Sequence, residues 1–218
     1  MLDGFNLLLL ERAMLLDGIK TTLYISSISL VLSIFFGFLV GFLRSTKNPI
    51  LNFLGAVHLE AFRIIPLMVW LFLAFFTLPT LIGSNSIGSQ TTAIIVFTVW
   101  GAAEMGDLVR GALLSLPTIQ RESGTALGLN GFQLFLYVLM PQAIRRLLPG
   151  MVNMATRLIK TSSVASIISV MEIIARGRQI IERTTQPFIV FTFIFFLFFF
   201  ICWPLSLFAN YLEKKSTF

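Results

Sequence analysis

Cysteine and histidine are almost missing from this chain, which has one of each, Cys202 and His58. One cysteine excludes an internal disulfide and a cysteine-cluster metal site, and His58 has no second metal ligand near it. The sequence contains no glycine-rich loop followed by Lys and Ser or Thr, so we expect no ATP site in this chain. A Ser/His/Asp set is not expected either. These absences predict a non-enzyme with no metal or cofactor of its own.

Charged residues are also scarce, at 12% of the 218 residues, while 56% are hydrophobic. The mean hydropathy is +0.90. A soluble protein keeps one face of each surface helix polar, so this composition indicates an integral membrane protein. The formal charge of +6 is spread along the chain, which favours cytoplasmic loops over nucleic-acid binding. A basic leader is missing from the acidic N-terminus, so we expect no cleavable signal peptide.

Five apolar stretches are long enough to cross a bilayer as helices. The basic residues Arg44 and Lys47 follow the first stretch, and Lys214 and Lys215 follow the last. The positive-inside rule then places the N-terminus outside and the C-terminus in the cytoplasm. We expect an interfacial helix before residue 17, an external loop at 83–90 and a charged external helix at 172–186. The predicted spans are residues 21–43, 57–81, 91–114, 143–169 and 187–212.

The second stretch has charges and a proline near its cytoplasmic end. Glu60 and Arg63 are three residues apart, so they can form an ion pair on one helix. Pro66 frees a backbone carbonyl one turn earlier, which predicts a kink.

Two acidic residues, Glu104 and Asp107, lie within the third predicted span. Charges inside a bilayer helix usually face a partner or a wet path. Arg110 follows Asp107 by three residues and can pair with it at the cytoplasmic end. Glu104 lies deeper and has no evident partner on its own helix. It either faces a solute path or pairs with another helix.

A polar stripe crosses the fourth predicted span, because Asn153, Arg157, Lys160 and Thr161 recur at helical spacing. Two cations have no favourable place against lipid. The stripe therefore lines a solute path, or its cations snorkel or pair with Glu104 or Asp107.

Between the third and fourth spans lies a segment that we call the docking loop (residues 117–141). Glu122 begins a short helix with small residues on one face, and Gly128 is expected to end it. Asn130 is expected to cap a second short helix ending near Pro141. With so little side chain, this helix pair would let another protein approach its backbone closely.

These residues resemble the EAA motif of ABC importer permeases. Glu122, Gly128, Val138 and Pro141 stand at the motif positions, while Ser123, Gly124 and Met140 replace two alanines and a leucine. Three further segments resemble the polar amino-acid permeases of the histidine, glutamine, arginine and glutamate type: Phe62-Arg-Ile-Ile-Pro-Leu, Asp107-Leu-Val-Arg-Gly and Lys160-Thr-Ser-Ser-Val.

The resemblance implies a type I importer permease with five transmembrane helices in one domain, and a coupling helix between the third and fourth. It also implies two ATP-binding ABC subunits that hold ATP and Mg, a second permease subunit, an extracytoplasmic solute-binding protein and a bacterial inner membrane. The residues expected to couple to the ATPase are Glu122, Ser123, Gly124, Ala126, Leu127, Gly128 and Leu129.

In the resembling family, the stretch matching residues 153–162 lines the central pocket. With Glu104, the expected solute path comprises Glu104, Asn153, Met154, Arg157, Lys160, Thr161 and Ser162. Structural or gating roles are expected for Arg63, Pro66, Asp107, Arg110 and Glu172. Thr161 replaces the aspartate of the family's KDTSL motif, so Arg157 favours a solute carboxylate over a basic side chain.

Three alternatives stay open on sequence alone. The chain could be the non-binding half of a heterodimeric permease, an ATP-independent channel or ion-coupled carrier, or a membrane anchor. A passive pore does not need the docking loop, and an anchor leaves the intramembrane charges unexplained.

Overall fold

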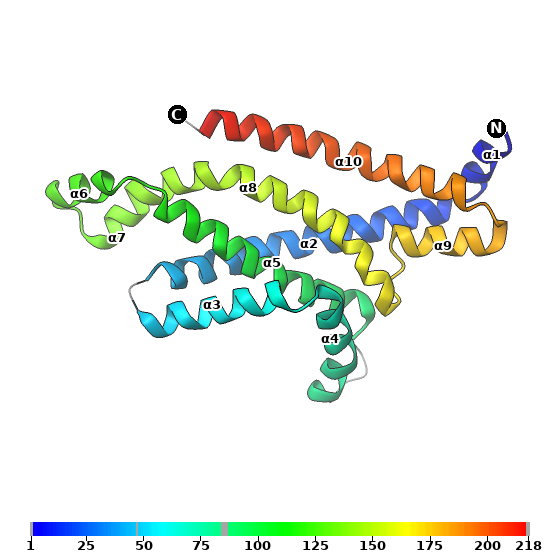
Figure 1. The fold of residues 1–218 in the computed structure, drawn as a ribbon, viewed down its shortest axis with the longest axis horizontal. Coiled ribbons are helices and arrows are strands. Elements are labelled where there is room, and N and C mark those ends of the chain that lie inside the picture. Colours follow the sequence, from blue (N-terminus) through cyan, green and yellow to red (C-terminus); the bar gives the residue numbers. More distant parts are fainter. Residues whose placement is uncertain (1, 47, 84–86, 217–218) are drawn as a thin grey trace.

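Every regular element in the computed structural model is a helix, within the residues that it describes, 2–46, 48–83 and 87–216 (Figure 1). The predicted all-α class is confirmed for that part of the chain. Lys47 and residues 84–86 of the expected external loop lie outside it. The helices are α1 (Leu2–Leu10), α2 (Arg12–Ser45), α3 (Pro49–Ile64), α4 (Leu67–Ile82), α5 (Ser89–Leu114), α6 (Thr118–Ala126), α7 (Gly131–Gln133), a π-helical segment (Leu134–Leu139), α8 (Met140–Thr161), a 3-10 segment (Ser162–Ile168), α9 (Ile173–Thr184) and α10 (Pro187–Ser216).

Three helices, α2, α5 and α10, are each long and apolar enough to cross a membrane. Two bent pairs also qualify, α3 with α4 and the segment 131–168 with α9. If each bent pair is one span, the described residues give up to five spans, the number predicted. Figure 1 shows α2, α5, α8 and α10 running along the long axis of the molecule, with α1 and α6 at its opposite ends.

The centre of the molecule is the contact between α2 and α5, where small residues let the backbones approach closely. Ser33 on α2 donates its hydroxyl to the Thr98 carbonyl at 3.2 Å. A Cβ on Gly37 would lie 2.4 Å from the Met105 Cβ, and one on Gly41 would lie 2.7 Å from the Gly106 carbonyl oxygen. Gly37 and Gly41 therefore act as a small-xxx-small packing pair. The sequence analysis missed this pair.

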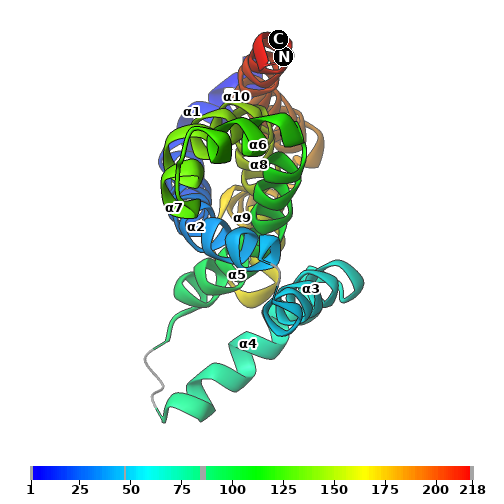
Figure 2. The ribbon, with the colours of Figure 1, turned by 90° about the vertical axis from the view of Figure 1, so that its left-hand side faces the viewer.

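The predicted kink at Pro66 is a complete break. The helix begins at Pro49, with Asn48 as its N-cap, and ends at Ile64, and the axes of α3 and α4 differ by 104°. Proline lacks an N–H and forces the residue before it out of the helical region, and Ile65 is extended at φ −84° and ψ 127°. The bend therefore lies at the predicted residue, but it separates two helices and is larger than a kink. In Figure 2, α4 projects away from the rest of the molecule.

Charged side chains tie α9 to the N-terminal part of α2. Arg176 pairs with Asp17, and Arg183 pairs with Glu11 at 2.8 Å. Asp17 lies in α2 and Glu11 is its N-cap residue, and both precede residue 21, where the predicted first span begins. α9 therefore packs at the same end of the molecule as the residues that precede the predicted first span.

Candidate functional site

The docking loop stands at the end of the molecule farthest from α1 (Figure 1). On α6, Glu122, Ser123 and Ala126 are exposed, and Leu127 just after it is 82% exposed. An exposed leucine beside an exposed carboxylate is suited to contact with another protein. This surface is the first candidate site.

A rigid turn joins α6 to α7. The Gly128 amide donates to the Thr125 carbonyl at 2.9 Å, and the Leu129 amide donates to the Gly124 carbonyl at 3.1 Å. This pair of bonds is a Schellman motif, and it requires the positive φ of 79° at Gly128. Asn130 then caps α7, since its side chain accepts from the Gln133 amide. Both expected helix boundaries are confirmed.

Two expectations for this loop were wrong. The second helix does not end near Pro141, because helical backbone continues from the π-helical segment into α8, whose second residue is Pro141. Gly124 does not offer its backbone to a partner. It is buried, and a Cβ there would lie 2.4 Å from a methyl carbon of Leu134 in the same chain. Its small size allows the loop to fold on itself.

The second candidate site is a row of five charged side chains, Arg44–Asp107–Arg63–Glu104–Arg157, which we call the charge row. Asp107 accepts from Arg44 at 3.0 Å and from Arg63 at 2.7 Å. Glu104 lies 3.1 Å from Arg157 and 3.9 Å from Arg63. The row therefore joins four helices, α2, α3, α5 and α8, through the two carboxylates of α5.

The expected partners of Asp107 and Arg63 were wrong. The structure shows no Asp107–Arg110 pair, because Arg110 donates to the Arg44 carbonyl at the end of α2. It pairs Arg63 with Asp107 on α5, whereas the sequence predicted a pair with Glu60 on its own helix. In the sequence analysis, Arg44 only indicated which end of the first span is cytoplasmic. In the structure its side chain is 8% exposed and belongs to the charge row.

Glu104 pairs with Arg157 on α8, and a partner on another helix was one of the two possibilities that the sequence left open. Its side chain is 19% exposed, and that of Arg157 is 49% exposed. The guanidinium of Arg157 also lies 5.3 Å from the centre of the Trp100 ring, in cation–π range. Trp100 was not predicted as a site residue.

The polar stripe of α8 is only partly where it was expected. Asn153, Arg157 and Lys160 are exposed on one face, and Thr161 is half-buried beside them. Met154 and Ser162 are 2% and 0% exposed, so in this structure they do not lie on the exposed face of α8. Met154 packs on Gly101 of α5, and the Ser162 hydroxyl donates to the Ile159 carbonyl.

Glu172 has a structural role. Its carboxylate is fully buried and accepts from the amides of Ile174 and Ala175, both at 2.8 Å, as the N-cap of α9. These two bonds satisfy amides at the start of α9 that have no partner within the helix. Glu172 therefore orients α9.

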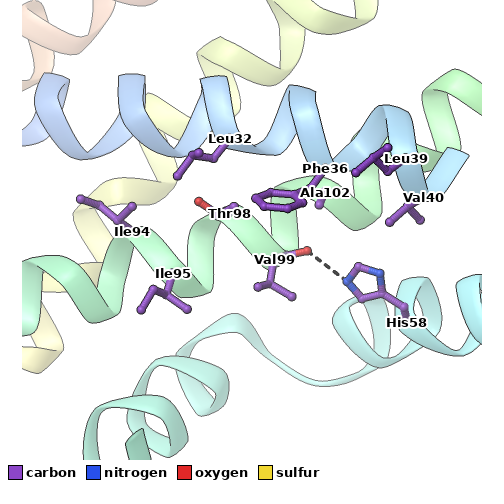
Figure 3. Close-up of a pocket in the computed structure, with 10 residues that line it drawn as sticks. All are labelled: Leu32, Phe36, Leu39, Val40, His58, Ile94, Ile95, Thr98, Val99 and Ala102. Atoms are coloured by element: carbon purple, nitrogen blue, oxygen red, sulfur yellow. Dashed lines mark hydrogen bonds between the residues drawn. The ribbon is translucent and has the colours of Figure 1, made fainter. Parts of the chain in front are cut away.

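A cavity of about 420 Å³ lies between α2, α3 and α5, as Figure 3 shows. Apart from His58 and Thr98, its lining is apolar, so it does not suit a charged solute. The Nε2 of His58 donates to the Val99 carbonyl at 3.2 Å, because a carbonyl oxygen can only accept. Within the described residues, no cluster of three or more His, Cys, Asp or Glu is placed to hold a metal.

Comparison with known proteins agrees with this geometry. The family model described as "Binding-protein-dependent transport system inner membrane component" matches residues 33–217. The probable glutamine ABC transporter permease protein GlnP of Bacillus subtilis (strain 168) is 34% identical, over 94% of each chain. The glutamine transport system permease protein GlnP of Escherichia coli (strain K12) is 31% identical, over 93% of this chain and 92% of its own.

Solved structures share the fold. One, an amino acid ABC transporter with histidines, has a TM-score of 0.85 at 20% identity and covers 94% of each chain. Another, the MetNI methionine ABC transporter in an inward-facing conformation, has a TM-score of 0.78 at 22% identity and covers 95% of this chain and 98% of its own. The chain belongs to the family of binding-protein-dependent transport system inner membrane components.

Proposed function

We propose that this chain is the membrane-spanning subunit of an ATP-driven importer of a polar amino acid in the bacterial cytoplasmic membrane. The docking loop carries the proposal. It is a rigid turn with exposed Glu122 and Leu127, placed at one end of a bundle of apolar helices. Because two curated relatives are glutamine permeases, glutamine is the first solute to test.

The proposed importer needs partners for energy and for solute capture. Two ATP-binding subunits hold ATP and Mg, and each contacts one docking loop. A second permease subunit, identical or related, completes the membrane part, and an extracytoplasmic binding protein delivers the solute. The N-terminus lies outside, and the C-terminus lies in the cytoplasm. ATP-driven closure of the ATPases then moves the docking loops and opens the path alternately to each side.

The exposed face of α8 is the proposed solute path. Arg157 supplies a cation that can bind a solute carboxylate, and Asn153 and Lys160 lie one turn to either side of it. Thr161 supplies no negative charge for a basic solute side chain. The path therefore favours a neutral or acidic amino acid over lysine or arginine.

The proposal is tested by Glu122→Lys, which reverses the charge on the exposed face of α6. We expect the ATPase subunit to co-purify less well, and ATP hydrolysis stimulated by loaded binding protein to fall in vesicles. Glu182→Lys, the same change on exposed α9 at the other end, is the control for co-purification. Full coupling in Glu122→Lys would contradict the assigned role of the docking loop. If no ATPase subunit co-purifies with the wild type, the proposed function itself fails.

A further inference from the structure

The Arg157 end of the charge row is open to a ligand. The row holds three cations and two carboxylates, and each carboxylate oxygen of Asp107 already has an arginine within 3.0 Å. Among the described residues, the hydrogen bond of the Arg157 guanidinium is to the Oε2 of Glu104, at 3.1 Å. Its side chain is 49% exposed. An arginine fork can bind a second carboxylate in addition to this one.

We propose that the Glu104–Arg157 pair is a binding site for the zwitterionic core of an α-amino acid. The pair opens, the solute carboxylate binds Arg157, and the solute ammonium binds Glu104. The inference rests on the proposed function and names the part of the solute that this site recognises.

The alternating signs of the charges in the row are the physical reason why this site selects a zwitterion. The row reads plus, minus, plus, minus, plus from Arg44 to Arg157. A zwitterion inserted before Arg157 adds plus, then minus, so every neighbour still has the opposite sign. A carboxylate without an ammonium would lie beside Glu104, and an amine without a carboxylate would lie beside Arg157. Both arrangements place like charges together in a membrane protein, where they are poorly screened.

The exposure and contacts of the two side chains indicate which of them moves when the pair opens. Glu104 is mostly buried, and its other oxygen lies 3.9 Å from Arg63, which holds it in place. Arg157 is long and half exposed, and its guanidinium lies near the face of Trp100. It can withdraw along that ring and still keep a favourable cation–π contact. Opening the pair therefore costs less than displacing a buried charge.

Trp100 provides a direct readout of the site. The chain has three tryptophans, and Phe at positions 70 and 203 leaves Trp100 as the only one. Trp70→Phe removes no hydrogen bond, because the Trp70 Nε1 is buried without a partner. Emission is then recorded in the purified complex with its ATPase subunits while each amino acid other than tryptophan is added. The emission of the same complex with Trp100→Phe, under the same additions, is subtracted, so that the difference reports Trp100. The amino acid that responds is compared with its deaminated and decarboxylated analogues.

We expect at least one amino acid to change the emission and neither analogue to do so at the same concentration. Glu104→Gln should weaken amino-acid binding about tenfold or more and admit the deaminated analogue, since the ammonium loses a charged partner and the carboxylate loses a repulsive one. Arg157→Gln should abolish the response.

Arg183→Gln is the matched control. Arg183 also pairs with a glutamate, Glu11, and the two side chains are 54% and 20% exposed, close to the values for Arg157 and Glu104. The proposal is overturned if no amino acid changes the emission, if both analogues bind as well as the amino acid, or if Arg183→Gln equals Arg157→Gln. Any of these results together with intact ATP-driven uptake refutes this site and leaves the proposed function standing.

Discussion

The turn of the docking loop depends on the positive φ of Gly128, and a substitution that adds one methyl group tests this dependence. Gly128 has φ +79°, and a Cβ placed there would meet nothing within 4 Å. Gly128→Ala therefore adds no clash, and its cost is conformational only. A left-handed conformation costs an L-residue about 1–2 kcal/mol, which lowers the population of the closed turn relative to open forms about 5- to 30-fold.

Gly131→Ala is the matched control three residues away. A Cβ on Gly131 also meets nothing within 4 Å, but Gly131 begins α7 and its φ is not left-handed. Alanine is a better helix former than glycine, so this change should be neutral or slightly stabilising. The two variants add the same atom to the same loop and differ only in the backbone angle.

The assay is binding of the purified ATPase subunit to the permease in vesicles, with ATPase stimulation measured in parallel. If the subunit binds only the closed turn, Gly128→Ala weakens binding by up to the factor above, and Gly131→Ala does not. Equal binding by the two variants would show that the ATPase does not depend on this turn. Weaker binding by Gly131→Ala than by Gly128→Ala would refute the argument from φ.

Two further predictions concern stability. Asn130→Ala removes the side-chain cap of α7 and should destabilise the docking loop by about 1 kcal/mol, measured as faster hydrogen exchange of the Gln133 amide; unchanged exchange would contradict the cap. Gly41→Val places a Cβ 2.7 Å from the Gly106 carbonyl oxygen, a backbone atom that cannot rotate away, and should lower the melting temperature in detergent. Gly111→Ala on α5, with open space around it, should leave the melting temperature unchanged, and equal melting of both variants would contradict tight α2–α5 packing.

The sequence predicted local features well because nearby residues determine them. Gly128 ends α6 and Asn130 caps α7 through bonds to residues at most five positions away. A helical class and the number of long apolar stretches follow from composition in the same way. The sequence also predicted a bend at Pro66, but it did not predict an angle as large as 104°. A kink and a break begin with the same missing hydrogen bond, and the packing of both halves decides between them.

Partners distant in sequence were either missed, as Arg44 was for Asp107, or left as one of several alternatives, as Arg157 was for Glu104. Arg44 and Asp107 are 63 residues apart, and Glu104 and Arg157 are 53 apart. For Asp107 the sequence favoured Arg110, because residues three apart on one helix are neighbours. The Gly37 and Gly41 spacing was visible, but without the position of α5 nothing identified it as a packing surface. Burial of Met154 and Ser162 likewise depends on which side of α8 faces the other helices.

The docking loop and the charge row are linked by continuous helix. Arg157 lies 17 residues after Met140, about 26 Å along α8, and helical backbone runs without interruption from Gly131 to Thr161. Glu104 lies on α5, and three residues separate the end of α5 from the start of α6. The two helices that carry the Glu104–Arg157 pair are thus the two helices that enter and leave the docking loop. A motion of the loop that turns α5 relative to α8 changes the 3.1 Å contact between Glu104 and Arg157. In the proposed importer, force on the docking loop and solute at the pair therefore act on the same ion pair.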